Sequence, residues 1–411
     1  MDMHGNKNWE FLMKIDFSPP DIQQEDIELV VETLRSGWIT TGPQTKRFET
    51  EIAAYCGTKT AACFHSATAA MELALRLMGI QSGDEVITSA YTYTASASVI
   101  AHVGARIVLV DTAPGSYQMD LDQLKVAITA KTKAIIAIDI AGIPANYSQI
   151  EKIVEEKREL FSARTKMQSQ LGRVMILADA AHSFGAVQNE LNSGLLADFT
   201  AFSFHAVKNL TTSEGGALTW RSWGSEVDKN IYRQLMLMSL HGQNKDALAK
   251  SKAGAWEYDI IAPYYKCNMT DICAALGISQ LKRYAQIVRR RREIIEKYNS
   301  IFFSEGWEPL LHEGRNYSSS MHLYLLRIPE IQEKQRNEII YLAGEAGISL
   351  NVHYKPLPMF TAYKNMGFSI ENFPNAYKQY ENEITLPLHM KLNDEEINYV
   401  TDTLIALGRR I

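Results

Sequence analysis

The sequence predicts an α/β fold in which a mostly parallel sheet is covered by helices, followed by a smaller α+β unit. Between residues 80 and 217, short β-branched runs alternate with helical patterns, and several of the runs are apolar on both faces. Strands that are buried on both faces belong to parallel sheets with helices on either side. A chain of 411 residues also exceeds one ordinary core, so we expect two or three structural units.

The strands of the predicted sheet are the short apolar runs at residues 85–87, 106–110, 134–138, 174–177 and 199–204. The connection over residues 146–172 is long for a single crossover. Its part rich in Glu, Lys and Arg, residues 151–159, predicts a solvated helix, and residues 162–172 predict a polar surface insertion.

The C-terminal third changes to a helical pattern. Asp271 is expected to be an N-cap, because apolar positions recur from Ile272 to Leu281 behind it. The four arginines at 289–292 would wrap around the following helix, so we interpret them as solvent-facing or subunit-pairing. Strand-like runs at 322–328, 348–352 and 383–386 indicate the smaller unit. We place a large domain at residues 1–275 and a small α+β domain at 276–411.

Composition excludes several classes of function. The 42 Lys and Arg residues against 47 Asp and Glu give a net charge of -5, which provides no general attraction to nucleic acid. No run approaches the roughly 20 apolar residues of a membrane span, and residues 1–20 lack the apolar core of a signal peptide. We therefore expect a cytoplasmic protein. The four cysteines form no Cys-x-x-Cys pair, which argues against a disulfide framework and a cysteine zinc site, and we expect no metal.

Lys208 is the first candidate for chemistry. It follows the strand-like run 199–204 and is flanked by Phe202, Phe204 and Val207. Partial desolvation there would lower the pKa of the amine and make it nucleophilic toward an aldehyde. Taken alone the signal is weak, because most lysines beside strands point into water.

Asp179 follows the apolar run 174–177, with Ala178 between them. Ligands of parallel sheets bind outside the carboxyl ends of the strands, so this carboxylate is presented to a pocket. A buried carboxylate needs a cationic partner, and a protonated pyridine nitrogen would serve. An N-cap for a following helix is an equally good interpretation of this segment.

A third candidate is the segment at residues 65–76, in which small polar residues precede a strong helix former. Exposed amides and hydroxyls at a helix N-terminus bind anions and suit a phosphate. Ser66 and Thr68 could also be ordinary helix caps.

The order of these motifs carries more information than any one of them. A phosphate-type helix start is followed by the aromatic Tyr91 and Tyr93, then by Asp179 and, 29 residues later (208 − 179), by Lys208. In this order the sequence resembles the fold-type I pyridoxal 5′-phosphate (PLP) enzymes, and among them the sugar aminotransferases of the DegT/DnrJ/EryC1/StrS family. The resemblance covers nearly the whole chain, with its most specific segments at residues 36–43, 83–88, 179–182, 203–216 and 352–357. It implies a large domain with a mostly parallel seven-stranded sheet and a smaller C-terminal domain.

The resemblance also implies how PLP is held. Lys208 would bond to the cofactor aldehyde and later move protons at the reacting carbon, and Asp179 would keep the pyridine nitrogen protonated. Tyr93 would stack on the cofactor face. His182 stands beside the cofactor's phenolic oxygen, where many members have Gln. The phosphate cradle would comprise Ser66, Ala67 through its backbone, Thr68 and Ser203.

Other matched positions concern the partner subunit and the substrate. Asn268 matches an asparagine that the family donates to the phosphate from the neighbouring subunit, which implies a homodimer with shared active sites. His353 and Tyr354 match a segment that approaches the sugar nucleotide, and Thr40 and Thr41 match an N-terminal loop near the substrate.

The predicted function is transfer of an amino group from L-glutamate to a keto sugar linked to a nucleotide, with pyridoxamine 5′-phosphate as the intermediate form of the cofactor. We favour the C4 keto group of a UDP-linked sugar and a role in surface glycan or aminosugar biosynthesis. Retention of Lys208, which is histidine in the family's dehydratase branch, favours transamination. The alternatives are a 3-keto sugar or cyclitol aminotransferase or a PLP dehydratase on the same scaffold, and a non-catalytic PLP-binding sensor.

Overall fold

The computed structural model of the chain describes residues 13–245 and 257–410. Its centre is a seven-stranded sheet in which β9 runs in the opposite direction to the other six strands. This confirms the predicted α/β class. The strands, in spatial order, are β1 Ala61–Phe64, β9 Gly216–Trp220, β8 Phe199–Ser203, β5 Met175–Asp179, β4 Thr132–Ile138, β2 Glu85–Ser89 and β3 Arg106–Val110.

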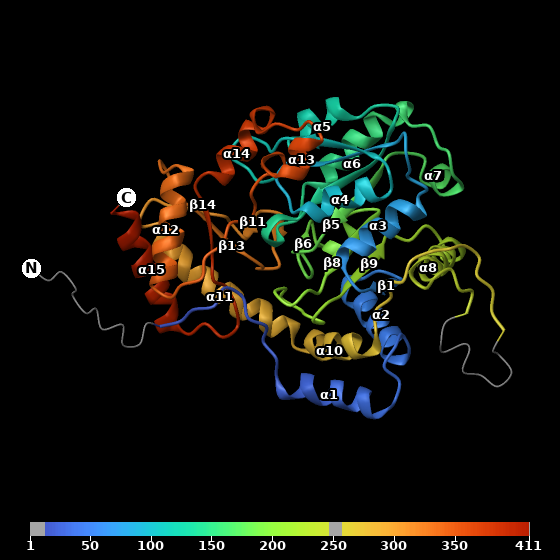
Figure 1. Cartoon of the computed structure of the whole chain (residues 1–411), viewed down its shortest axis with the longest axis horizontal. Coiled ribbons are helices and arrows are strands. Elements are labelled where there is room, and N and C mark those ends of the chain that lie inside the picture. Colours follow the sequence, from blue (N-terminus) through green and yellow to red (C-terminus); the bar gives the residue numbers. More distant parts are fainter. Residues whose placement is uncertain (1–12, 246–256, 411) are drawn as a thin grey trace, which may run out of the picture.

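Helices cover both faces of this sheet (Figure 1). One face packs a core that includes α3 Ala67–Leu77, α4 Thr94–His102 and α8 Ser225–Ser239. The other face packs on α2 Pro43–Cys56, α5 Leu121–Ala127, α6 Tyr147–Glu156 and α10 Asp271–Lys282. Because both faces are buried, the strands are nearly continuous apolar runs, as a helix-covered parallel sheet requires.

The C-terminal part is a second core. The strands β10 Glu308–Pro309, β13 Tyr324–Arg327 and β14 Glu383–Leu386 form an antiparallel sheet in this order. It packs with α11 Tyr284–Phe302, α12 Glu333–Glu345 and α15 Asp394–Gly408, and the shorter α13 Thr361–Asn365 and α14 Pro374–Tyr380 lie between α12 and β14 in the chain. The strand predicted at 348–352 is wrong, because only isolated bridges form at Ile348 and Asn351.

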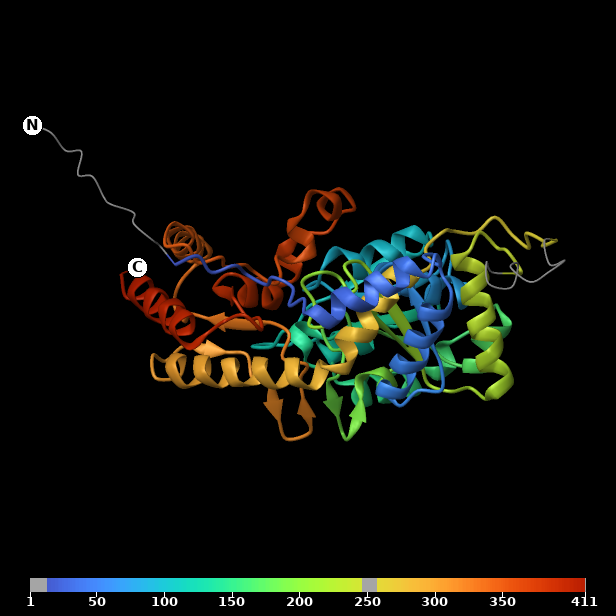
Figure 2. The ribbon, with the colours of Figure 1, turned by 90° about the horizontal axis from the view of Figure 1, so that it is seen from below.

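Two hairpins lie side by side in the view of Figure 2. They are β6 Val187–Gln188 with β7 Leu191–Asn192, and β11 Glu313–Gly314 with β12 Tyr317–Ser318, and β12 pairs with β6. They join the two halves of the chain. Helix α10 runs across residues 275 and 276 and packs on both α1 Gln24–Arg35 and α2, so the predicted domain boundary stays a prediction, and residues 1–12 of the first domain lie outside the described residues.

Several local predictions need correction. Thr270, rather than Asp271, is the N-cap of α10. Asp271 is buried and accepts hydrogen bonds from the backbone N–H groups of Gly42, Gln44 and Thr45, so it caps α2. Arg291 was predicted to face solvent or a partner subunit, but it is buried. Its guanidinium donates to the carbonyl oxygens of Met321 and His322, two residues that precede β13.

The connection at residues 146–172 is exposed over most of its length, as predicted. The predicted helix at 151–159 is the end of α6 and a 3-10 turn, Arg158–Leu160. The segment predicted as a surface insertion contains a short helix, α7 Lys166–Leu171. Gln168 anchors α7, because its buried side chain donates to the carbonyl oxygen of Met78 at 3.0 Å. No helix in residues 13–245 and 257–410 is long and apolar enough to cross a membrane.

Candidate active site

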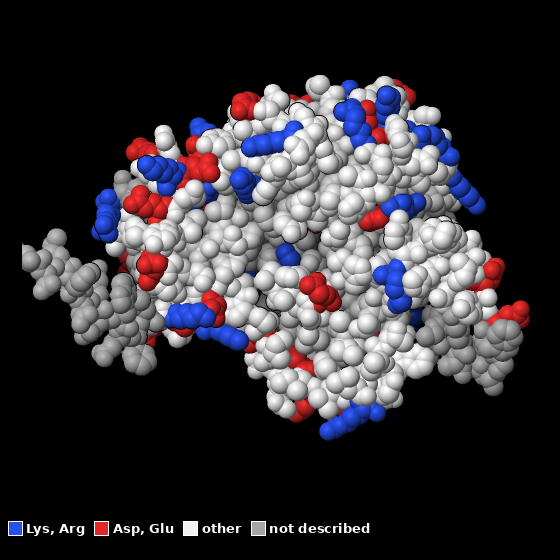
Figure 3. All heavy atoms as spheres, in the orientation of Figure 1, with Lys and Arg blue, Asp and Glu red and all other residues white. Residues whose placement is uncertain are grey.

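A cavity of about 340 Å³ lies where the carboxyl ends of β4, β5 and β8 meet the C-terminal part. Figure 3 shows a hollow near the centre of this face with Lys or Arg atoms inside it. Ten of the thirteen predicted site residues line the cavity: Ser66, Ala67, Thr68, Tyr93, Asp179, His182, Ser203, Lys208, His353 and Tyr354. Among the described residues that line it, Lys208 is the one Lys or Arg.

Lys208 stands in the turn after β8, where its backbone N–H donates to the carbonyl oxygen of His205 at 2.9 Å. Burial disfavours the ammonium form and lowers the pKa of Lys208 to about 8, against the opposing charge of Asp179. An amine with this pKa is neutral in a substantial fraction near physiological pH. The predicted desolvation of Lys208 is thus present, and it supports attack on an aldehyde.

Asp179 is the last residue of β5 and is 6% exposed. Ser96 Oγ donates to its Oδ2 at 2.6 Å, and the Ala181 N–H donates to its Oδ1 at 3.3 Å. Burial raises the pKa of Asp179, and these two hydrogen bonds oppose the shift. In the described part of the chain no cationic side chain is hydrogen-bonded to this carboxylate. A turn rather than a helix follows β5, so the interpretation of Asp179 as a helix cap is wrong.

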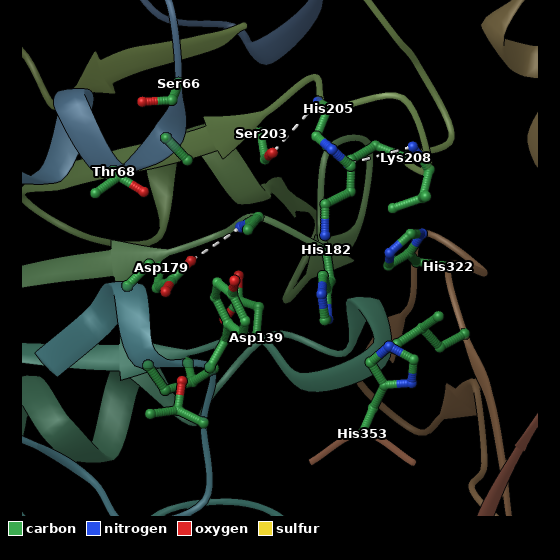
Figure 4. A pocket seen from close by; sticks show the side chains of 18 of the residues that line it. Ser66, Thr68, Asp139, Asp179, His182, Ser203, His205, Lys208, His322 and His353 are labelled. Atoms are coloured by element: carbon green, nitrogen blue, oxygen red, sulfur yellow. Dashed lines mark hydrogen bonds between the residues drawn. The ribbon is translucent and has the colours of Figure 1, made fainter. Parts of the chain in front are cut away.

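The start of α3 forms the cavity wall that lies across from His322 and His353 in Figure 4. Ser66 is the N-cap of α3, and its side chain accepts from the Ala69 N–H at 3.1 Å. Ser66 is therefore a helix cap, and its predicted contact with a phosphate stays a prediction. Ala67 and Thr68 open the helix, and amides at these positions have no acceptor within it. A side chain on Gly216 would place its Cβ 2.4 Å from the Ala67 nitrogen, so only glycine lets β9 pass this close to the start of α3.

His182 has a defined tautomer. The Ala141 N–H donates to its Nδ1 at 3.2 Å, so in the neutral ring the hydrogen is on Nε2, which lies 2.9 Å from the Tyr354 hydroxyl. Burial, and then the charge of Lys208, hold the pKa of His182 well below its usual value. His182 Nε2–H therefore donates to the Tyr354 hydroxyl at the cavity, and its contact with the phenolic oxygen of a cofactor stays a prediction.

Aromatic rings complete the cavity. Tyr93 is 59% exposed although it lines the cavity, and its ring centroid lies 5.8 Å from that of Tyr354. An uncovered ring at this position can stack on a flat aromatic ligand.

Thr40, Thr41 and Asn268 lie elsewhere. Asn268 Nδ2 donates to Thr41 Oγ1, and Thr41 Oγ1 donates to the Met269 carbonyl oxygen at 2.5 Å. The carbonyl oxygen of the exposed Thr40 accepts from the N–H of Asp271. These three residues gather at the start of α10 and do not line the cavity of their own chain. The contribution of Asn268 to a neighbouring subunit's phosphate site and the approach of Thr40 and Thr41 to the substrate stay predictions.

The sequence reasoning missed two residues that line the cavity, Asp139 and His322, and a third, Ser96, that donates to Asp179. Asp139 follows β4 and accepts hydrogen bonds from Tyr147 and Ser183, and burial raises its pKa to about 7. His322 lines the cavity with its ring centroid 4.5 Å from that of His182. Asp139 ends an apolar strand just as Asp179 does, so a signal for it existed. Nothing local marked His322 or Ser96, because their partners lie far away in the sequence.

Comparison with known proteins decides the family. The model of the DegT/DnrJ/EryC1/StrS aminotransferase family matches residues 20–405. The chain belongs to this family. The putative sugar aminotransferase Spr1654 from Streptococcus pneumoniae, in its PMP form, is 50% identical with a TM-score of 0.94 over 97% of this chain and 100% of that one. A structure of the PLP form of Spr1654 is similar as well.

Two further similar proteins are named for the biosynthesis of a polysaccharide and of pseudoaminic acid. The spore coat polysaccharide biosynthesis protein SpsC of Bacillus subtilis is 36% identical over 394 residues, 94% of this chain and 95% of its own. Helicobacter pylori PseC, an aminotransferase involved in the biosynthesis of pseudoaminic acid, is 25% identical with a TM-score of 0.84 over 97% of this chain and 100% of that one.

The chain is therefore a sugar aminotransferase that uses PLP, as the sequence motifs predicted. The donor set fits this cofactor. A buried carboxylate to which no cationic side chain of the described residues is hydrogen-bonded suits a pyridinium nitrogen, the start of α3 suits a phosphate, and the amine of Lys208 suits an aldehyde.

Proposed function

We propose that this family member transfers the amino group of L-glutamate to the C4 keto group of a UDP-linked sugar, for aminosugar or surface glycan biosynthesis in the cytoplasm. The observation that carries the aminotransferase chemistry is that Lys208 and Asp179 face one cavity together with the start of α3. The names of SpsC and PseC, which refer to a coat polysaccharide and to pseudoaminic acid, support a glycan precursor as the acceptor.

In the proposed mechanism, PLP supplies an electron sink for the pair of electrons left when a proton leaves the amino-acid carbon. Lys208 would hold the cofactor aldehyde through Nζ and, as a free amine, would move the proton at the reacting carbon. Its lowered pKa lets one amine serve as base and then as acid near neutral pH. Asp179 holds the proton on the ring nitrogen.

Three further groups position the cofactor in this proposal. The amides of Ala67 and Thr68 bind the phosphate, with Ser203 at the end of β8 as an additional donor. His182 would donate from Nε2 to the phenolic oxygen in place of the Tyr354 hydroxyl. Tyr93 would cover the ring face. Together these residues would hold the cofactor in one orientation relative to Lys208.

We propose that the sugar nucleotide enters beside His353 and Tyr354, which line the cavity from the C-terminal part. Thr40 and Thr41 would approach it from a loop of the partner subunit, and Asn268 would complete the partner's phosphate site. Exposed apolar side chains on and after α1, Ile27, Leu34 and Ile39, support a homodimer that covers this region.

The two half-reactions provide the test. Purified protein loaded with PLP should convert to the pyridoxamine form with L-glutamate and release one equivalent of 2-oxoglutarate. That form should then return to the PLP form with a 4-keto UDP-sugar and give a product aminated at C4. Lys208→Ala should do neither. A product aminated at C3 would refute the C4 assignment, and activity only with cyclitol ketones would refute the nucleotide sugar.

A further inference from the structure

The cavity wall contributed by the C-terminal part contains a chain of three hydrogen-bonding side chains. His353 Nδ1 lies 3.0 Å from Thr385 Oγ1, and Thr385 Oγ1 lies 2.5 Å from Glu383 Oε1. The other carboxyl oxygen, Glu383 Oε2, accepts from the backbone N–H of His353 at 3.0 Å. One glutamate thus holds both the backbone and, through Thr385, the ring of His353.

The strand β14 sets this arrangement. Glu383 and Thr385 are two residues apart, so their side chains emerge on the same face of the strand. Both are fully buried, at 0% exposed. Asn351 bridges to Thr385 through the backbone, which brings His353 alongside. Phe17 stacks on the far side of the imidazole, with centroids 5.6 Å apart and planes at 17°.

The second ring nitrogen of His353 is available to a ligand. His353 lines the cavity beside His182 and Lys208 (Figure 4). No group in the described part of the chain is hydrogen-bonded to His353 Nε2, and this atom is not sealed from solvent. The ring is therefore fixed at Nδ1 and open at Nε2.

We propose that Thr385 and Glu383 are positioning residues that act on the sugar substrate through His353. The hydrogen shared along Glu383, Thr385 and His353 decides which ring nitrogen of His353 is protonated, and therefore whether Nε2 meets the substrate as a donor or as an acceptor.

The number of hydrogens that these three side chains can donate allows two arrangements of the hydrogen bonds. A threonine hydroxyl has one hydrogen to donate, so it points either to Glu383 or to His353. With Glu383 ionised, Thr385 donates to the carboxylate, His353 Nδ1–H donates to Thr385, and Nε2 is an acceptor. With Glu383 neutral, its O–H donates to Thr385, Thr385 donates to Nδ1, and the hydrogen of the ring is on Nε2.

The surroundings of Glu383 favour the neutral form at physiological pH. Burial raises the pKa of Glu383 to about 8, although the hydrogen bonds from Thr385 and the His353 N–H oppose the shift. The guanidinium of Arg336, on α12, donates to the backbone carbonyl oxygen of Glu383 at 2.8 Å and not to the carboxyl group, and its charge lowers the pKa of Glu383 less than burial raises it.

The remaining titratable groups around Glu383 leave this balance unchanged. They are the phenols of Tyr91, Tyr117 and Tyr354, whose pKa values are raised by burial and then by nearby carboxylates. These phenols stay neutral over the range in which Glu383 titrates. Burial and the charge of Lys208 also lower the pKa of His353 to about 3. His353 therefore changes tautomer without becoming charged.

The consequence for the substrate rests on the proposed function. Below about pH 8, Nε2–H is a donor suited to a keto or ring oxygen, or to a phosphate oxygen, of the sugar nucleotide. Above it, Nε2 is an acceptor suited to a sugar hydroxyl. The hydrogen-bond relay formed by Glu383, Thr385 and His353 requires no substrate, so it can be tested whichever sugar is the acceptor.

The direct test is ¹⁵N NMR of PLP-loaded protein labelled at histidine, with His353 assigned from the spectrum of His353→Gln. From pH 6 to 10 we expect Nε2 to move from the shift of a protonated ring nitrogen to that of an unprotonated one, and Nδ1 to move in reverse, with a midpoint near the pKa of Glu383 at about 8. Thr385→Ser should preserve the exchange. Thr385→Val and Glu383→Gln, checked for thermal stability, should abolish its pH dependence.

A kinetic readout separates positioning from structure. Thr385→Val should raise KM for the sugar nucleotide about threefold to tenfold, the range expected for one hydrogen bond, and leave the glutamate half-reaction unchanged, and Thr385→Ser should restore KM. The proposal is overturned if the wild-type His353 tautomer stays constant across the pH range, or if the exchange persists in Thr385→Val. If the enzyme aminates no sugar nucleotide but the tautomer exchange is observed, the proposed acceptor is refuted and the proposed relay is not.

Discussion

Ser96 Oγ donates a 2.6 Å hydrogen bond to Oδ2 of Asp179, although the two residues lie 83 positions apart. Ser96 stands in the first turn of α4, and Asp179 ends β5. The bond fixes Oδ2, whereas Oδ1 accepts only the longer, 3.3 Å hydrogen bond from the Ala181 N–H. Ser96 is thus a support for the residue that we expect to hold the pyridine nitrogen protonated.

Asp179→Asn should lower the rate of the glutamate half-reaction by at least about 100-fold, because a neutral amide cannot keep the ring nitrogen charged. Ser96→Ala should cost only about tenfold, the value of one hydrogen bond to a charged group. Stopped-flow absorbance of both variants, each loaded with PLP, measures the difference. Equal rates for Asp179→Asn and the wild type would show that this carboxylate plays no part in the chemistry.

The lowered pKa of Lys208 predicts how the apoprotein takes up its cofactor. Only the neutral amine attacks an aldehyde, so the rate of reconstitution with PLP should rise with pH and level off above about pH 8, where the amine loses its proton. A lysine in water would give a midpoint above pH 10. Absorbance after mixing measures the rate. A midpoint of 10 or more would mean that the cavity does not desolvate Lys208.

Substitutions of Asp271 and Thr270 compare how much two helix caps contribute to the free energy of unfolding. Thr270→Ala removes the cap of α10 and should lower the free energy of unfolding by about 1 kcal/mol. Asp271→Ala leaves three backbone N–H groups at the start of α2 without their acceptor, and should cost about 2 kcal/mol or more. Denaturant unfolding compares the two. A smaller loss for Asp271→Ala than for Thr270→Ala would refute this assignment.

Asp271 also illustrates where sequence reasoning stops. Its local pattern predicts a helix start, and a helix does start there. The true role of the side chain depends on α2, more than 200 residues away. The central strands and the chain order of Ser66, Asp179 and Lys208 could be predicted, because apolar runs and motif spacing are local properties.

The short strands β1 and β9, the buried Arg291 and the cavity position of His322 could not be predicted in the same way. Each is fixed by pairing or burial against distant segments. The failed strand at 348–352 has the same cause. Its residues have β propensity, but they lie where only isolated bridges to Ile15 and Thr385 are available.

A mixed-subunit experiment tests the sharing of active sites. Lys208→Ala and Asn268→Ala should each be inactive or weak as homodimers. When the two variants are unfolded and refolded together, about half of the dimers are mixed, and each mixed dimer has one site with both residues intact if Asn268 acts across the interface. Recovered turnover above either parent is therefore expected. No recovery, with mixed dimers shown by mass spectrometry, would place Asn268 in its own subunit's site or outside both.

The central claim is that Lys208 is the residue to which the cofactor bonds. Reduction of the PLP-loaded protein with sodium borohydride, followed by peptide mass mapping, tests it most directly. We predict a single pyridoxyl adduct on the peptide that contains Lys208, and none after the same treatment of Lys208→Ala. An adduct on another lysine, or no adduct on protein that has bound PLP, would contradict the account.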